Sequence, residues 1–274
     1  MSEAMARDYQ VVKAYPHGTF SWLDLASTDA EAAKNFYSQL FDWEIVDMPL
    51  PDGGVYTMLK QDGHDVAGLS QMSAEQKEMG MPSYWSSYIA VDNVGEMVSK
   101  VEAAGGKIVV PPFDVMEEGR MAVIQDSTGG TVCMWEAKNH IGAKLVNVPN
   151  SLVWNELVTN DVDGARAFYG EVFGWEANLS MEEPIYYSFM NGGRAAGGLM
   201  EIAPEWGDMP PSWFIYIAVK DVAAKAAEAE SLGGKLMMPP TEAQGVGTFS
   251  LIQDPTGAMF YVIAMTQADA PPGY

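Results

Sequence analysis

The fold of this 274-residue chain is decided by two stretches. Residues 20–44 read FSWLDLASTDAEAAKNFYSQLFDWE, and residues 152–176 read LVWNELVTNDVDGARAFYGEVFGWE. The two align without a gap, so that Trp22 corresponds to Trp154, 132 positions later. Repetition at a fixed spacing indicates a duplicated structural unit. The sequence therefore predicts two copies of one module.

Each copy begins with a strand and a helix. In residues 20–26 the side chains alternate between two faces, which is typical of a β-strand. Thr28 and Glu31 form a capping-box pattern, in which the threonine side chain accepts a backbone N–H at the start of a helix. Apolar residues then recur between Ala33 and Phe41 at the spacing of one helix face.

The remaining motifs of the first copy return in the second. About three strands follow the helix, and a second strand–helix–strands unit runs from 84 to 137. The spacing between counterparts falls from 132 to 130 and then to 128, which indicates two short deletions in loops. The predicted fold class is α+β, with two tandem modules, each a pair of βαβββ units that form a concave curved sheet with helices on its outer face. The predicted divisions are a lead-in at 1–17, module 1 at 18–137, a linker at 138–149, module 2 at 150–265 and a flexible tail at 266–274.

The charge of the chain is strongly acidic. Asp and Glu outnumber Lys and Arg by 37 to 15, which gives a formal net charge of −22. Such a surface repels phosphate backbones and anionic lipids, so neither nucleic acid nor a membrane is an expected partner. The charge favours a neutral or cationic ligand, and the alternative explanations for it are solubility or a salt-adapted organism.

Cys133 is the single cysteine, so neither an intrachain disulfide nor a cysteine-based zinc site can form. The first residues lack the charged and apolar regions of a signal peptide, and no apolar run is long enough to cross a membrane. We therefore expect a cytoplasmic protein.

These motifs resemble those of a known superfamily. A strand, a helix with Phe-Tyr, the pattern LFxW, and a QDxTG turn before a last strand follow one another as in the vicinal oxygen chelate superfamily, which includes glyoxalases, bleomycin-resistance proteins and extradiol dioxygenases. The resemblance covers residues 18–137 and 150–265 and is closest to the double-module, glyoxalase-like branch. It implies the curved-sheet fold described above, while the superfamily supports many reactions on this scaffold.

Catalytic members of this superfamily hold a divalent metal ion with two residues from each module, and the resemblance locates these four positions. They lie seven residues before the aspartate that opens the first helix of a module, and seven residues after the aspartate of its QDxTG turn. In this chain two of the positions hold tryptophan, and the other two hold a cysteine and a tyrosine. Tryptophan is only a hydrogen-bond donor, and one thiol with one phenol does not suit a hard or borderline cation. We therefore expect no metal ion and no other cofactor. The four positions hold Trp22, Cys133, Trp154 and Tyr261.

Other residues of the concave faces are the candidates for function. Asp24 and Glu156 follow the two tryptophans by two positions, so each carboxylate shares a face of its strand with an indole, an arrangement that suits a cationic or amine-bearing ligand. We assign the catalytic or charged role to these two acids, because buried acids are rare unless they are paired or used. In the alternative interpretation, the tryptophans fill a cavity and the acids pair with a local hydroxyl, an indole or Arg120. The candidate ligand-binding residues are Trp22, Trp85, Tyr88, Cys133, Trp154, Trp213, Tyr216 and Tyr261.

The three histidines, His17, His64 and His140, lie in the lead-in, in a hairpin and in the linker. None has a metal-binding spacing or a counterpart in the other copy, so we expect all three at the surface. A metal site formed by Asp24 and Glu156 would require the modules to bring these two acids together.

Three functions remain open. The first is a metal-free protein that binds a small aromatic or cationic molecule in acid- and tryptophan-lined concavities. The second is a glyoxalase-type lyase or isomerase in which Asp24 or Glu156 is the general base. The third is a non-catalytic interaction protein whose pockets have closed. Two modules can pair within one chain, so a monomer or a homodimer with a small-molecule ligand is expected.

Overall fold

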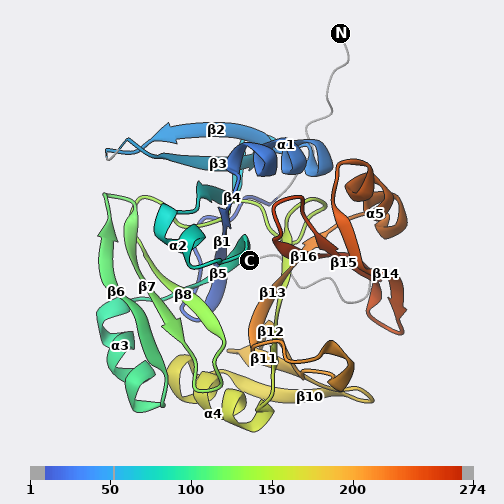
Figure 1. Ribbon diagram of the computed structural model, residues 1–274. Helices are drawn as coiled ribbons and strands as arrows, with labels where there is room; N and C mark the ends of the chain where they lie inside the picture. Colours follow the sequence, from blue (N-terminus) through green and yellow to red (C-terminus); the bar gives the residue numbers. More distant parts are fainter. Residues whose placement is uncertain (1–9, 52, 267–274) are drawn as a thin grey trace.

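The computed structural model describes residues 10–51 and 53–266, and each module forms one eight-stranded sheet (Figure 1). The strands of module 1 are β1 (Thr19–Ser27), β2 (Glu44–Pro49), β3 (Val55–Gln61), β4 (His64–Gln71), β5 (Tyr84–Ala90), β6 (Lys107–Val115), β7 (Gly119–Gln125) and β8 (Thr131–Ala137). Their spatial order is β2-β3-β4-β1-β5-β8-β7-β6. The two βαβββ units meet in the middle, where β1 pairs antiparallel with β5.

Module 2 repeats this topology in the order β10-β11-β12-β9-β13-β16-β15-β14. The predicted α+β fold, with two tandem modules built from pairs of βαβββ units, is therefore confirmed. The strands of module 2 are β9 (Leu152–Thr159), β10 (Glu176–Glu182), β11 (Ile185–Asn191), β12 (Arg194–Glu201), β13 (Ser212–Ala218), β14 (Lys235–Ala243), β15 (Gly247–Gln253) and β16 (Met259–Met265).

The first helix of each module is capped by an aspartate. Asp29 accepts a hydrogen bond from the backbone of Ala32, and Asp161 accepts one from Gly164. The prediction that Thr28 caps the first helix is wrong, because its hydroxyl instead contacts Ser83 at 3.1 Å. The helices are α1 (Ala30–Phe41), α2 (Ala74–Glu78), α3 (Val94–Ala103), α4 (Val162–Phe173) and α5 (Val222–Ser231), with a 3₁₀ turn η1 (Pro204–Trp206).

The two modules interlock through their helices. Helix α1 of module 1 packs beside α5 of module 2, and α3 packs beside α4 (Figure 1). The hydroxyl of Tyr37 on α1 donates to the carboxylate of Asp254 in module 2 at 2.9 Å. Tyr169 on α4 makes the reciprocal bond to Asp126 of module 1 at 2.8 Å. Consequently, the two main apolar cores each contain side chains from both modules.

The linker is more deeply packed than its polar composition suggested. Ala143 and Leu145 are fully buried. The backbone of Ala143 donates to the carbonyl of Ser21 at 2.7 Å, and that of Lys144 donates to Asp65 at 2.7 Å. The linker therefore runs along β1 as part of module 1. Residues 1–9 of the predicted lead-in and 267–274 of the predicted tail lie outside the described residues.

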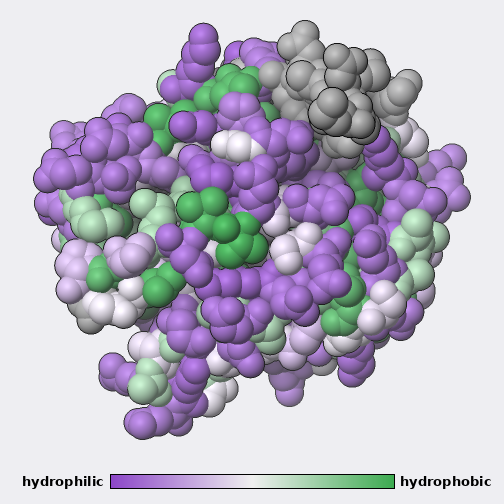
Figure 2. Space-filling model, turned by 90° about the horizontal axis from the view of Figure 1, so that it is seen from above, coloured by the Kyte–Doolittle hydropathy of each residue, from purple (hydrophilic) through white to green (hydrophobic). Residues whose placement is uncertain are grey.

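The face seen from above is mainly hydrophilic, with scattered hydrophobic areas (Figure 2). This agrees with the acidic composition of the chain. Within residues 10–51 and 53–266, no helix is long and apolar enough to cross a membrane.

Candidate functional site

Three neighbouring strands bring the predicted site residues into one row in each module. In module 1, Trp22 on β1 pairs with Tyr88 on β5, which pairs with Cys133 on β8. We call the sheet face that carries this row the concave face. In module 2 the row consists of Trp154, Tyr216 and Tyr261.

A hydrogen-bond chain connects the indole to the carboxylate in module 1. The Nε1 atom of Trp22 donates to the hydroxyl oxygen of Tyr56 at 3.1 Å. That hydroxyl in turn donates to Oδ2 of Asp24 at 2.9 Å. Trp22 itself is only 5% exposed, so it orients Tyr56 rather than offering an open ring to a ligand. Asp24, by contrast, is partly exposed.

Module 2 contains the same chain around a more enclosed acid. Trp154 donates to the hydroxyl of Tyr186 at 2.9 Å, and Tyr186 lies close enough to Glu156 to favour its ionised form. A second donor, the hydroxyl of Tyr216, contacts Oε1 of Glu156 at 2.8 Å. Glu156 is 6% exposed, so in this module the protein itself satisfies and covers the carboxylate.

A glycine on the neighbouring strand makes room for the tyrosine in both modules. A Cβ atom on Gly68 would lie 1.9 Å from the hydroxyl oxygen of Tyr56. A Cβ atom on Gly198 would lie 1.9 Å from that of Tyr186. Only glycine therefore allows the tyrosine to cross β4 or β12 and reach the acid on the next strand.

The pKa values of both acids are shifted upward. Burial raises the pKa of Asp24 from 3.8 to about 7, and the hydrogen bond from Tyr56 opposes this shift. Burial also raises the pKa of Glu156, while hydrogen bonds from Tyr216 and Tyr186 act in the other direction. The carboxyl group of Asp24 thus changes its charge near neutral pH.

The four positions that hold a metal ion in catalytic relatives do not fit one here. Trp22 and Trp154 use their only polar atoms to donate to tyrosines. Burial raises the pKa of Cys133 to about 12 and also raises that of Tyr261, so both remain protonated and poor ligands at neutral pH. Over the described part of the chain, no three His, Cys, Asp or Glu side chains are grouped so that they could hold a metal ion.

Trp85 and Trp213 were predicted to bind the ligand, but they lie on the opposite side of the sheet from this row. Trp85 lies on the helix side of the sheet, where its Nε1 donates to the hydroxyl of Tyr37 at 2.9 Å. Trp213 makes the equivalent bond to Tyr169 at 2.7 Å. Trp85 is three positions from Tyr88, and Trp213 is three positions from Tyr216. Residues an odd number of positions apart on a strand point to opposite faces of the sheet. Their assignment as ligand-binding residues is therefore corrected.

His140 is not the surface residue that we expected. Its ring lies 4.6 Å from the Trp22 ring, nearly perpendicular to it, and the carbonyl of His140 accepts a hydrogen bond from Trp135. Burial lowers the pKa of His140. The linker therefore packs the imidazole of His140 against the ring of Trp22. His17 and His64 are both partly exposed.

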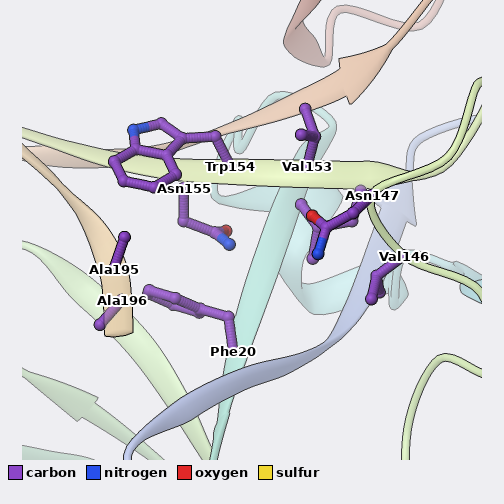
Figure 3. A pocket seen from close by; sticks show the side chains of 9 residues that line it. Phe20, Val146, Asn147, Val153, Trp154, Asn155, Ala195 and Ala196 are labelled. Atoms are coloured by element: carbon purple, nitrogen blue, oxygen red, sulfur yellow. The ribbon is translucent and has the colours of Figure 1, made fainter. Parts of the chain in front are cut away.

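A small pocket borders the second tryptophan, between the start of β9, the start of β12, the linker and β1 (Figure 3). Ala195, Ala196 and Phe20 lie on one side of it, and Val146 and Asn147 lie on the other. A second pocket lies between the lead-in, the end of β5 and β8, and includes Trp135. Neither pocket is lined by Asp24 or Glu156.

Sequence reasoning did not assign four residues that complete the two hydrogen-bond chains. These are Tyr56 and Tyr186, which bridge indole and acid, and Gly68 and Gly198, which admit the tyrosines. The duplication contained the signal, because each tyrosine and each glycine recurs at the same place in the second copy.

The fold and this site define the class of protein. The family model for the Glyoxalase/Bleomycin resistance protein/Dioxygenase superfamily matches residues 19–134 and 150–262. The chain belongs to this superfamily, as the sequence motifs predicted.

Individual relatives that align with this chain over nearly their whole length refine the comparison. The chain is 42% identical to "Putative glyoxylase CFP32" of Mycobacterium tuberculosis, over 91% of this chain and 95% of the relative. It is 31% identical to "Anthracycline biosynthesis protein DnrV" of Streptomyces peucetius, over 91% of this chain and 94% of the relative.

Solved structures share the fold at low sequence identity. The Mn(II)-bound glyoxalase from Novosphingobium aromaticivorans has a TM-score of 0.62 and 15% identity, covering 90% of this chain and 82% of that one. The 2,3-dioxygenase LapB from Pseudomonas sp. KL28 has a TM-score of 0.62 and 12% identity, covering 96% of both chains.

Proposed function

We propose that this protein binds a small aromatic molecule with a cationic group on a concave face, without a divalent metal ion. The observation that carries the proposal is Asp24, a partly exposed residue whose carboxyl group has its pKa raised by burial to about 7. It has one hydrogen-bond donor, Tyr56, and no second one among the residues that the structure describes. A bound ammonium group would supply the missing partner and stabilise the ionised form.

The surroundings support an aromatic, positively charged ligand. Tyr84, half-buried, and Tyr88 lie close enough to Asp24 for its charge to influence their hydroxyl groups. Aromatic walls and one carboxylate are the elements of a site for an organic cation. The net charge of −22 would attract such a ligand over a longer range. The name of the Streptomyces relative points to anthracyclines, which are polycyclic aromatic compounds.

The donor atoms at the four family positions support the metal-free part of the proposal. Two indoles, one buried thiol and one buried phenol offer no ionised ligand at neutral pH. We therefore assign recognition of the ligand to charge and ring contacts of the protein itself.

Three indoles of similar size test the proposal: tryptamine, 3-methylindole and indole-3-acetate, which are cationic, neutral and anionic. Calorimetry on protein dialysed against EDTA is expected to show binding in that order of affinity, unchanged by added Mn²⁺ or Zn²⁺. Asp24→Asn is expected to reduce the preference for tryptamine over 3-methylindole by about tenfold or more. Failure of all three indoles to bind, or binding that requires the metal, would refute the proposal.

A second function is favoured by the same carboxyl group. A pKa near the working pH is the property of an efficient general base, so Asp24 could remove a proton next to a carbonyl group. We would detect this by NMR as exchange of the carbon-bound protons of dihydroxyacetone in D₂O. The exchange is expected to require Asp24, and its absence from the wild-type protein would leave binding as the function.

A further inference from the structure

In module 1, Asp24 belongs to a group of small or polar side chains. The register between β1 and β5 pairs Asp24 with Ser86, and Ala26 with Tyr84. All four residues are partly exposed, and we call them the module 1 floor. The neighbouring helix α2 contributes no buried side chain, although its Gln76 donates to the hydroxyl of Tyr84 at 3.3 Å. The β5 position that pairs with Asp24 therefore holds no aromatic ring.

In module 2 the equivalent positions are covered. Glu156 pairs with Phe214 across β9 and β13, and Val158 replaces Ala26. The exposed fractions of Glu156, Val158 and Phe214 are 6%, 1% and 8%. The ring of Phe214 meets that of Tyr261 edge to face, with the ring centroids 5.6 Å apart. Thus Phe214 lies where module 1 has the hydroxymethyl group of a serine.

The rings of module 2 form an apolar cluster of their own. Phe214, Tyr216 and Tyr261 belong to it, and the last two are stacked with their centroids 4.4 Å apart. Trp206 and Met209, from the loop around η1, pack against this cluster. Module 2 therefore fills its concave face with its own side chains. Two of them, Phe214 and Tyr261, are aromatic where module 1 has a serine and a cysteine.

We infer that module 1 alone holds the ligand, and that the ligand's aromatic ring lies over Ser86 and Ala26, where module 2 places the ring of Phe214. The ammonium group of the ligand contacts Asp24, and the edge of its ring meets Tyr84. This inference rests on the proposed function. It adds which module binds the ligand and which side chains leave room for the ligand's ring. Phe214 lies beside Glu156 in module 2, so an aromatic ring fits next to a carboxylate on this scaffold.

The pocket beside Trp154 does not offer the same chemistry. Its lining contains apolar side chains and two asparagines, with no carboxylate to contact an ammonium group. The ring of Trp154 also uses its only donor on Tyr186. A cation that avoided Asp24 and used this pocket would remain without a charged partner.

A pair of serine-to-phenylalanine variants tests the inference by calorimetry with tryptamine. Wild-type protein is expected to bind one tryptamine per chain. Ser86→Phe introduces the module 2 side chain into the floor and is expected to weaken binding on the order of tenfold or more. Ser212→Phe makes the same substitution at the module 2 counterpart of Tyr84 and is expected to leave the affinity unchanged.

A variant with a smaller increase in side-chain volume tests the inference if Ser86→Phe does not fold. Ala26→Val introduces the natural side chain of module 2 at the edge of the floor, and is also expected to weaken tryptamine binding. Two equivalent sites per chain, full affinity in the folded Ser86→Phe and Ala26→Val variants, or loss of binding in folded Ser212→Phe would overturn the inference. If wild-type protein binds none of the three indoles, the proposed function itself fails, which is a different result.

Discussion

The ionised carboxyl group of Asp24 is expected to destabilise the folded protein. Its pKa is raised from 3.8 to about 7, mainly because burial disfavours the charged form. The unfolded chain therefore loses this proton at lower pH than the folded protein does. The free energy of unfolding is consequently lowered as pH rises from about 4 to about 7, and the reduction is complete above that range. At about 1.4 kcal/mol for each pKa unit, the upper limit of this cost is about 4 kcal/mol.

Replacing this acid is expected to stabilise the protein. Asp24→Asn keeps an acceptor for Tyr56 and removes the buried charge. We expect its free energy of unfolding to exceed that of the wild type by about 2 kcal/mol at pH 8, with the difference disappearing toward pH 4. Urea denaturation at several pH values measures this. A variant that is equally destabilised at every pH would show that Asp24 is stabilising and that its pKa is not raised.

The same titration predicts how ligand affinity depends on pH. An alkylammonium group stays charged up to about pH 10, so of the two groups in this contact Asp24 is the one that changes its charge between pH 5 and 8. Affinity for tryptamine is expected to be constant above about pH 8 and to fall about tenfold per pH unit below about pH 6. Calorimetry in two buffers of different ionisation enthalpy would also detect one proton released on binding near pH 6. An affinity that does not vary over this range would exclude Asp24 as the contact.

At the scale of elements, strand parity explains what the sequence could predict. Alternation along β1 correctly put Trp22 and Asp24 on one face, and register brought Tyr88 and Cys133 beside them. The same rule, applied to β5, excludes Trp85 from that face, since it is three residues from Tyr88. That error was avoidable from the sequence alone.

Other features could not be predicted because they depend on long-range packing. The chain from Ala137 to β9 has the composition of a loop, yet it lies along β1 and places His140 over Trp22. Similarly, nothing in the repeated stretch indicates that α1 donates a hydrogen bond to the other module. Composition describes a segment, whereas its neighbours in three dimensions decide its burial.

Glycine at one position of β4 controls the hydrogen-bond chain to Asp24. In Gly68→Ala the added Cβ would lie 1.9 Å from the Tyr56 hydroxyl, so the tyrosine has to leave its position. We expect a loss of about 1 to 3 kcal/mol in the free energy of unfolding and weaker tryptamine binding.

The matched substitution separates stability from binding. Gly198→Ala moves Tyr186 in the same way. It is expected to cost similar stability in thermal denaturation, while a ligand held by module 1 keeps its affinity. Equal losses of tryptamine affinity in Gly68→Ala and Gly198→Ala would contradict the assignment of the ligand to one module.

At the scale of the whole molecule, the interlocked helices make the two modules interdependent. A tryptophan of the sheet extends each hydrogen bond between the modules. Trp85 donates to the hydroxyl of Tyr37, which donates to the carboxylate of Asp254. The reciprocal chain includes Trp213, Tyr169 and Asp126 in the same order. Since both main cores combine residues of the two modules, neither module encloses a complete core by itself.

Removing one hydroxyl from this interface is therefore expected to destabilise the entire protein. Tyr37→Phe leaves the indole N–H of Trp85 and the Oδ2 atom of Asp254 without their buried partner, at a cost of about 2 to 4 kcal/mol. Tyr169→Phe should cost about as much, and both variants should unfold in a single calorimetric transition that is shifted to lower temperature. Tyr187→Phe is the control, because this ring contacts Arg166 through its face and is expected to keep that contact. Two separate transitions, with only the mutated module shifted, would show that the modules fold independently despite their shared cores.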